Sequence, residues 1–448
     1  MGKKLLRIGA GAGYAGDRIP PAEELAREGR LDYLVFECLA ERTIALAQLE
    51  RMKNPALGFD PLLSDRLRAV LAPCLAQGVR ILSNMGAAHP LAAGQQALAV
   101  AEELGLAPFP VAVLTGDDVL EVLLERGLDL PLIDSPERLA DLKDRVVSAN
   151  AYLGAEALLP ALATPAPVIL TGRVADPALF LAPLVHEFGW ALNDWPRLGR
   201  GVAVGHLLEC AAQVTGGYFA DPGVKDVPDL ARLGFPLAEV EASGEAVITK
   251  VAGSGGRVSV ATCTEQLLYE LEDPQRYLQP DVVADFSQVQ FEADGPDRVR
   301  VYGASGSART DSLKVTVGYC DGFIGEGQIS YAGPGARARG ELALALVHER
   351  LKAAGLGGLE MRLDLIGVNA ILGPGASACE PDEVRVRVAM RAPTQREALL
   401  AANEVEALYL NGPAGGGGAS KSVREVVAAA SLLMPRDWAR PQVHLLER

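Results

Sequence analysis

The first half of the chain alternates short apolar runs with longer segments in which apolar residues recur every three or four positions. The apolar runs, which predict β-strands, are 4–10, 32–37, 79–83, 110–115 and 167–172. The intervening segments, which predict helices, include 40–52, 62–77, 91–104 and 136–159. Such alternation is typical of a parallel sheet with helices on both faces. We therefore expect an α/β domain over residues 1–238.

From about residue 240 the pattern changes to alternation in period two, interrupted by glycine turns. "EVEASGEAVITKVAGSGGRVSV" (239–260) predicts a β-hairpin. Further strands are expected near 297–303, 312–319, 359–368 and 383–391, and helices at 338–354 and 394–410. The segment 221–240 is rich in Asp, Pro and Gly, which marks a junction. We expect a second, α+β domain over residues 239–448, in which the helices lie on one face of a sheet.

Several predicted strands in the first half end in small or polar residues: "GAGAG", "SNMGAAHP", "TGDD" and "TGRVADP". In open parallel sheets, ligands bind at the carboxyl ends of the strands. His89 is a candidate for acid–base catalysis there, and Asn84 and Arg173 are candidate hydrogen-bond donors. Asp117 and Asp176 could be catalytic or could cap the following helices. Several carboxylates at one edge could also hold a divalent cation, although no spacing requires a metal.

The loop after the first strand, "GAGYAG", matches G-x-G-x-x-G through Gly11, Gly13 and Gly16. Glu37 follows at the end of the next strand, where a dinucleotide-binding fold places the acid that binds the ribose. However, the helix that should begin inside the glycines is delayed by "DRIPP". A nicotinamide site and a ligand-free turn are therefore two of three interpretations.

In the third interpretation, this loop exposes backbone N–H groups and Arg18 to an anion, with Asp17 as an acid or base. Asp17 joins His89, Asn84, Arg173 and Asp176 among the candidate catalytic residues.

A second glycine-rich segment, "NGPAGGGGASKS" (411–422), nearly matches the phosphate loop G-x-x-x-x-G-K-[ST], but it follows a predicted helix instead of a strand. We expect a helix over "SVREVVAAASLL" (422–433), with Ser420 as its N-cap. A cation in the first turn opposes the helix dipole, which favours a bound anion over a structural hinge. The candidate anion-binding residues are Gly415, Gly416, Gly417, Gly418, Ser420 and Lys421.

Two further groups are weaker candidates. Lys225, in the loop "GGYFADPGVKDVPD" (216–229), could bind an anion, form a Schiff base or be a solvated side chain. His206, Glu209 and Cys210 share one face of a predicted helix. An interior helix face is favoured there over metal ligation.

Composition restricts the class of protein. The apolar fraction of 49% with 22% charged residues is that of a folded globular protein. A formal charge of −15 argues against nucleic-acid binding. The six cysteines form no C-x-x-C pair, which is consistent with a reducing compartment. Since no run of about 18 apolar residues occurs, we expect a cytoplasmic protein without a membrane span.

Six segments together resemble the acyclic terpene utilisation (AtuA-like) family over nearly the full chain: "GAGAGYAGDR", "DYLVFECLAERTIA", "ILSNMGAAHP", "GGYFADPG", "TEQLLYELEDPQRYLQPDV" and "NGPAGGGGASKSVREVV". The resemblance implies a role in the breakdown of citronellyl- and geranyl-type acids as CoA thioesters. The implied step cleaves a 3-hydroxy-3-isohexenylglutaryl-CoA-like compound to an acyl-CoA and acetate. Longer members carry a small ferredoxin-like domain, which would here be absent or a separate partner chain. The resemblance supplies no catalytic residues.

We therefore expect a C–C lyase acting on a CoA ester or another carboxylated small molecule, with CoA as part of the substrate. An acyl-CoA hydratase or dehydratase would need nearly the same residues. An NAD(P)-dependent oxidoreductase is a third hypothesis, and a non-catalytic subunit that binds a small partner chain is a fourth. A homo-oligomer is expected, and the requirement for a divalent metal stays open.

Overall fold

The computed structural model describes residues 5–373 and 380–447. The chain divides into two compact units, Met1–Gly318 with Ala429–Arg448, and Tyr319–Ala428. Two long strands, β14 (Ser312–Ala332) and β17 (Gly417–Pro435), each contribute to both units.

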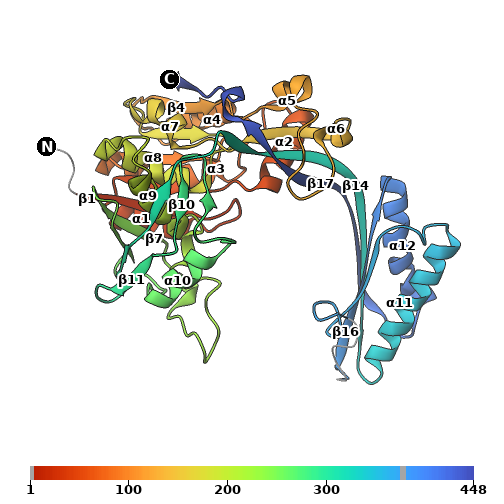
Figure 1. Cartoon of the computed structure of the whole chain (residues 1–448). Coiled ribbons are helices and arrows are strands. Elements are labelled where there is room, and N and C mark those ends of the chain that lie inside the picture. Colours follow the sequence, from red (N-terminus) through yellow and green to blue (C-terminus); the bar gives the residue numbers. More distant parts are fainter. Residues whose placement is uncertain (1–4, 374–379, 448) are drawn as a thin grey trace. The chain divides into compact units, whose positions relative to one another are not determined.

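A ten-stranded sheet forms the centre of the first unit, in the order β11-β12-β8-β7-β1-β2-β3-β6-β4-β18. Its strands β1, β4, β7 and β11 are labelled in Figure 1. The strands are β1 Leu5–Ala12, β2 Tyr33–Phe36, β3 Arg80–Ser83, β4 Val111–Thr115, β6 Val168–Thr171, β7 Pro236–Glu241, β8 Ala246–Lys250, β11 Gln290–Ala293, β12 Val299–Tyr302 and β18 Gln442–Leu446. The five strands β1-β2-β3-β6-β4 are parallel. They coincide with the five strands expected from the sequence, and the α/β class is confirmed.

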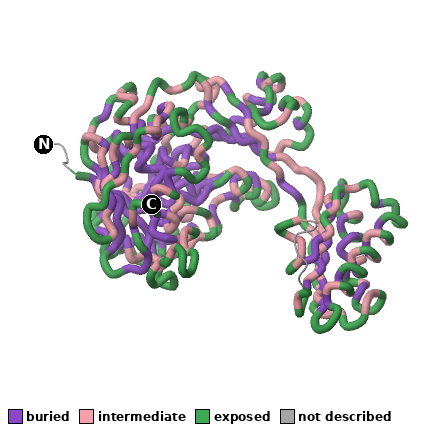
Figure 2. Tube along the Cα trace, turned by 60° about the horizontal axis from the view of Figure 1, so that its bottom comes forward, coloured by how far each residue is buried: buried purple, intermediate pink, exposed green. Residues whose placement is uncertain are grey.

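The first unit contains the following helices, some of which form two rows against this sheet. They are α1 Pro20–Glu28, α2 Glu41–Lys53, α3 Leu63–Gln77, α4 Pro90–Glu103, α5 Leu120–Arg126, α6 Leu139–Leu142, α7 Ala155–Leu162, α8 Asp176–Phe188, α9 Trp195–Leu208 and α10 Val260–Leu268. In one row α3 packs between α1 and α4, and in the other α8 packs between α7 and α9. The parallel strands between the rows are almost entirely buried (Figure 2). Proline in the first turn sets φ for the start of α1, α4, α8 and α9.

The strand order reverses between β3 and β6, which are neighbours in the sheet. The chain leaves β3 through α4 toward β4, and it leaves β6 through α8 in the opposite direction, toward β7. Such a reversal opens a crevice beyond the carboxyl ends of the two strands, where open α/β sheets bind ligands. The switch point is therefore where a ligand site is expected in this fold.

Smaller elements complete the first unit. β9 (Tyr277–Leu278), β10 (Val283–Asp285) and β13 (Ser305–Ser307) form a three-stranded sheet. The 3₁₀ turns are Ala211–Gln213, Leu230–Arg232 and Arg436–Trp438. In the part of the chain that the structure describes, no helix combines the length and hydrophobicity needed to cross a membrane. Five cysteines are free, and Cys379 lies outside the described residues.

The long helix expected over 136–159 is wrong. This segment contains α6, the strand β5 (Val146–Ala151) and α7. β5 pairs with β14, whose residues lie more distantly along the chain. Helix-forming residues flank β5 on both sides, so the local sequence does not indicate a strand there. The strand forms because it pairs with β14, which is distant along the chain.

The compact units also divide at a different place from the expected boundary at 238/239. That position lies inside β7, which pairs with β1 on one side and with β8 on the other. The hairpin expected over 239–260 is present as β7 and β8, but it extends the first sheet. The turn-rich composition before it marks a loop and not a division between cores.

The second unit has the order β14-α11-β15-β16-α12-β17, with α11 Ala336–Ala353, β15 Met361–Ile366, β16 Glu383–Ala392 and α12 Gln395–Asn411. Its sheet order is β15-β16-β14-β17, the split β-α-β arrangement of ferredoxin-like domains. Both helices pack on one face, over a core that includes Ile329, Val347, Val386 and Val405.

The helix expected over 422–433 is wrong, because this segment lies within β17. Val423, Val426 and Val427 are β-branched and suit a strand, whereas the alanines beside them suit a helix. Pairing with β14 at the edge of the sheet decides between the two.

Candidate functional site

Three polar residues that follow β2, β3 and β6 meet at the switch point. They are Glu37, Asn84 and Arg173, and each is more than nine-tenths buried. The Asn84 Nδ2 donates to Glu37 Oε1 at 2.9 Å. The Arg173 Nη1 donates to the carbonyl oxygen of Leu39, two residues beyond Glu37. The sequence indicated Asn84 and Arg173 as hydrogen-bond donors at strand ends and Glu37 as a ribose-binding acid, and the structure brings the three residues together.

Glu37 is held by donors from its own chain segment. Its Oε1 also accepts from the backbone N–H of Leu39 at 2.8 Å, while Asn84 Oδ1 accepts from Cys38 N at 2.7 Å. Burial and the neighbouring Asp176 raise the pKa of Glu37 well above its usual range. A buried carboxyl that is already hydrogen-bonded does not suit the ribose-binding role expected in a dinucleotide site.

Arg173 is fixed from several directions. Asp117 Oδ2 accepts from the Arg173 backbone N–H at 2.8 Å and from Asn150 Nδ2 at 2.9 Å. The Arg173 guanidinium lies 4.0 Å from the centroid of the Tyr152 ring, and its Nη2 lies 3.0 Å from Asp176 Oδ1. Burial alone would lower the pKa of Arg173, but Asp176 and the other acids raise it. Arg173 is therefore a permanent buried cation, and Asp117 positions it.

Asp176 is a partly exposed carboxyl group that forms an ion pair with Arg173. Its side chain is 34% exposed, and it is the first residue of α8. Burial raises its pKa to about 7, the Arg173 charge opposes this rise, and the charges of Glu209, Glu41 and Glu270 add to it. A carboxyl that titrates near neutral pH can accept and return a proton, as general acid–base catalysis requires.

Glu41 lies on the other side of Tyr152. It accepts a hydrogen bond from the Tyr152 hydroxyl and forms an ion pair with Lys314 at 3.2 Å. Burial opposes its ionisation, but the hydrogen bond from Tyr152 and the charges of Arg173 and Lys314 prevail and lower its pKa to about 2. Two carboxyl groups near the same arginine, Glu41 and Asp176, thus have very different proton affinities, as in enzymes that assign acid and base roles by environment. We call Glu37, Glu41, Tyr152, Arg173 and Asp176 the switch-point site.

A cavity of about 490 Å³ opens beside these residues, a volume suited to a small ligand. Its polar lining includes Glu41, Asp176, Arg173, Lys314, Tyr152, Tyr277 and Glu270. Glu270 has φ +57°, a strained conformation for this residue type of the kind that gathers at functional sites. Ile133, Leu278, Leu313 and Leu433 supply an apolar side.

Behind Asp176, His206 and Glu209 form a buried pair. His206 Nδ1 lies 2.7 Å from Glu209 Oε1, and its Nε2 lies 3.0 Å from the carbonyl oxygen of Leu267. Burial opposes the charged imidazolium, but the charge and hydrogen bond of Glu209, together with the Leu267 carbonyl and Glu270, raise the pKa of His206. Among residues 5–373 and 380–447, no group of three or more His, Cys, Asp and Glu side chains is arranged to hold a metal ion. The interior helix face expected here therefore carries a buried, hydrogen-bonded His206–Glu209 pair.

Unpaired buried atoms at this place indicate room for a ligand or water. Within the described part of the chain, Arg173 Nε and Glu209 Oε2 are buried and have no hydrogen-bond partner. Buried polar atoms are rarely left unpaired, because the lost hydrogen bond costs about 1–3 kcal/mol.

The glycine loop after β1 is held by its own chain. Gly13 N donates to Asp17 Oδ2 at 2.9 Å, and Arg18 N donates to Asp17 Oδ1 at 2.8 Å. Arg66 Nη2 donates to the carbonyl oxygens of Ala15 at 3.0 Å and Asp17 at 3.2 Å. Burial raises the pKa of Asp17. Asp17 thus organises the loop, and the Arg18 side chain is exposed.

Two of the glycines are required for packing. A Cβ on Gly11 would lie 2.6 Å from the Phe36 ring, and one on Gly13 would lie 2.5 Å from the carbonyl carbon of Cys210. Gly16 is exposed, and its Cβ would meet only the Tyr14 ring. Since α1 does not begin inside the glycines, no helix N-terminus faces a pyrophosphate there. This geometry favours a structural turn over a nicotinamide site.

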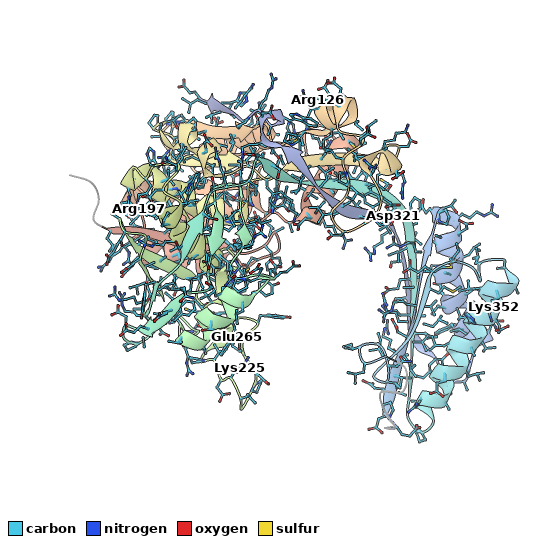
Figure 3. All side chains as sticks on the ribbon, viewed as in Figure 1. Arg126, Arg197, Lys225, Glu265, Asp321 and Lys352 are labelled. Atoms are coloured by element: carbon cyan, nitrogen blue, oxygen red, sulfur yellow. The ribbon has the colours of Figure 1, made fainter. Side chains whose placement is uncertain are left out.

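Two other candidates lie apart from the switch-point site. His89 Nδ1 lies 3.2 Å from the carbonyl oxygen of Leu57, and burial lowers the pKa of His89. Lys225 forms an ion pair with Glu265 of α10, and both residues are labelled in Figure 3. The Lys225 Nζ also lies 4.9 Å from the centroid of the Phe219 ring. The ion pair makes a Schiff-base or anion-binding role for Lys225 less favourable than a solvated surface contact.

The C-terminal glycines belong to the second unit. Gly417 and Gly418 begin β17, so that Ser420 is a strand residue and not an N-cap. Lys421 Nζ forms an ion pair with Glu406 and a hydrogen bond of 2.9 Å with Asn403 Oδ1, both on α12. The helix-dipole argument for an anion at Lys421 therefore fails.

Several site residues were not expected from the sequence. Glu41, Tyr152 and Lys314 lie in α2, after β5 and in β14, and none of them follows one of the expected strands. Arg66 lies within α3 and is fully buried. One local feature could have indicated Arg66: it occupies a position of α3 whose neighbours are core residues. Because arginine is almost never fully buried unless it is paired, an arginine at such a position is expected to have partners inside the protein.

Neither the comparison with curated proteins nor the comparison with solved structures found a match. The family model described as "Acyclic terpene utilisation family protein AtuA" matches residues 6–445, which is nearly the whole chain. The match includes the strand ends that form the switch-point site and both glycine segments. The chain therefore belongs to the acyclic terpene utilisation family AtuA.

Proposed function

We propose that this protein is a C–C lyase of acyclic terpene utilisation, and that its substrate is a carboxylated CoA thioester resembling a 3-hydroxy-3-alkylglutaryl-CoA. One observation carries this proposal. Asp176, partly exposed and with a pKa of about 7, lies against the buried cation Arg173 at a cavity of about 490 Å³.

The residues suit a retro-aldol cleavage. Asp176 removes the proton of the tertiary hydroxyl group, and the carbon that carries this group becomes a ketone as its bond to the neighbouring CH₂ breaks. The electron pair of that bond passes to the CH₂ carbon and spreads onto the adjoining carboxylate. Asp176 then returns the proton to this carbon, which yields acetate and a 3-oxoacyl-CoA. Arg173 and Lys314 stabilise the negative charge that develops.

The cavity lining also suits a branched hydrocarbon chain. Ile133, Leu278, Leu313 and Leu433 are apolar, whereas the carboxyl and cationic groups gather around Arg173. Ligand sites of this size commonly combine an apolar wall with a few convergent polar groups. An alkyl branch would lie on the apolar wall while the hydroxyl and carboxylate face Asp176 and Lys314.

An acyl-CoA hydratase or dehydratase is the second candidate, because a proton-transferring carboxyl beside a cation also serves the addition or loss of water. The two reactions differ in their products. The expected homo-oligomer and small partner chain belong to the proposal as well, and native mass spectrometry of the purified full chain would report either one as added mass.

The test is to incubate the full chain with a 3-hydroxy-3-alkylglutaryl-CoA and to identify the products by mass spectrometry. We expect acetate and a 3-oxoacyl-CoA in equal amounts. Asp176→Asn should lower the rate by about 100-fold or more, with a nearly unchanged melting temperature. Asp65→Asn is the matched control, since Asp65 is an exposed carboxylate of α3. An unsaturated product would favour the hydratase, and wild-type turnover by Asp176→Asn would refute the role of the site.

A further inference from the structure

One face of the sheet in the second unit is not covered by α11 and α12. The residues of β16 alternate, so that Val384, Val386, Val388 and Met390 enter the core with the helices. Arg385, Arg387 and Arg391 point to the other face. The three arginines lie on the same strand and on the same face of the sheet, so that their hydrogen-bond and ion-pair partners can be compared directly.

Two of the arginines are neutralised by carboxylates. Arg387 pairs with Glu326 at 2.6 Å and with Asp364 at 2.8 Å. Arg391 pairs with Asp321 of β14, labelled in Figure 3, and approaches Glu360 at 3.5 Å. The positive charges of Arg387 and Arg391 are therefore neutralised by ion pairs within the second unit.

Arg385 differs because its partners are neutral. Its Nη1 donates to Ser330 Oγ at 2.9 Å and its Nη2 donates to Ser420 Oγ at 3.1 Å. Its Nε donates to Gln328 Oε1. Over residues 5–373 and 380–447, no carboxylate forms an ion pair with Arg385. The guanidinium charge is thus uncompensated, although its hydrogen bonds fix its position.

The two serines extend this positive group with further donors. A hydroxyl that accepts a hydrogen bond keeps its own proton for donation and can rotate it toward a ligand. Ser330 Oγ and Ser420 Oγ both accept from Arg385, so that their O–H groups remain available beside the guanidinium. This arrangement resembles the donor sets that bind carboxylate and phosphate oxygens.

Arg385 lines a cavity of about 460 Å³ together with Ser330, Gly415 and Gly417. Gly415 adopts φ +76°, which permits its turn beside the cavity. A Cβ on Gly417 would meet no atom within 4 Å, so this part of the main chain faces open space. Glu383 also lines the cavity and is exposed.

We infer that this Arg385 cavity binds the oxyanion group of a small molecule, either a phosphate or a carboxylate. The inference is independent of the lyase proposal, since every residue that carries it belongs to the second unit. It also differs from the anion site expected from the sequence, because Arg385 replaces Lys421 as the cation. The glycines serve as an open wall and not as a phosphate loop.

The test measures binding of inorganic phosphate and, separately, of glutarate to the full chain by isothermal titration calorimetry at constant ionic strength. Hydrogen–deuterium exchange of the same samples should show slower exchange over residues 412–420 and 326–332. Arg385→Gln should weaken binding at least tenfold, because it removes the charge. Arg391→Gln is the matched control and should bind as the wild type does.

Two further variants keep the test decisive if Arg385→Gln does not fold. Arg385→Lys retains the charge but loses the planar fork, and should weaken binding several-fold. Gly417→Ala adds a methyl group to the open wall and should weaken binding without a change in melting temperature. Binding of phosphate alone, or of glutarate alone, would identify the oxyanion. Absence of binding to either anion, or equal binding by the wild type and all Arg385 and Gly417 variants, would overturn the inference.

Discussion

The guanidinium of Arg173 lies over the Tyr152 ring, 4.0 Å from its centroid, and this contact joins the two carboxyl groups of the switch-point site. Asp176 meets the guanidinium, while the Tyr152 hydroxyl donates to Glu41. The Tyr152 ring thus contacts Arg173 while its hydroxyl contacts Glu41, and substitutions of Tyr152 can remove one contact without the other.

Tyr152→Phe keeps the ring beneath Arg173 but removes the hydrogen bond to Glu41. We expect the pKa of Glu41 to rise from about 2 toward its usual range, which NMR titration of the side-chain carboxyl would measure. Tyr152→Leu removes the ring as well and should lower kcat/KM by about tenfold or more, as for loss of a desolvated cation–π contact. If both variants lower kcat/KM equally, the ring has no separate role.

The rate should depend on the protonation of Asp176. As the base that removes the hydroxyl proton, Asp176 must be ionised, and its pKa is raised to about 7. The value of kcat should therefore increase with pH up to about 7 and then level off, whereas an ordinary aspartate would give no change in this range. The profile of Asp176→Glu, which keeps a carboxyl in an altered position, should have a shifted midpoint. An unshifted midpoint in that variant would assign the titration to another group.

Asp117 should make the free energy of unfolding depend on pH. Burial raises its pKa to about 6 in the folded state, against an ordinary value of 3.8. Between these values the folded protein binds the proton more tightly, so stability falls as pH rises from about 4 to about 6. In Asp117→Asn this contribution is absent, and the slope of stability against pH over that interval should be less negative. Urea unfolding of both proteins at several pH values measures this difference.

The glycine loop after β1 offers a matched pair of substitutions. Gly13→Ala would place its Cβ 2.5 Å from the main chain of Cys210, and should destabilise the first unit by about 1–3 kcal/mol or more. In Gly16→Ala the new Cβ meets only the ring of the exposed Tyr14, which can move. Chemical unfolding should show almost no change for this variant. If Gly16→Ala were the more costly of the two, the turn would need another explanation.

Much of the first sheet could be predicted from the sequence, because each parallel strand is a short apolar run bounded by helical periodicity. The strand ends then indicated Glu37, Asn84, Arg173 and Asp176, since polar residues after buried strands converge at one edge. These positions follow from local pattern and from a general rule of open sheets.

The remaining site residues depend on pairings between distant segments. Tyr152 follows β5, whose partner is β14, and Lys314 lies in β14 itself. No local pattern marks either residue. The same reason explains the error over 422–433, where the alanines favour a helix and the position beside β14 imposes a strand.

The parallel strands, the glycine turns and the family can all be recognised in short segments of the amino-acid sequence. Which charged groups remain available to a ligand depends instead on the three-dimensional fold. Lys421 is neutralised by Glu406, whereas Arg385 meets neutral acceptors and Asp176 lies where burial and neighbouring acids raise its pKa to about 7. This follows because the protonation and pairing of a charged group depend on its burial and on partners that the fold brings from distant segments.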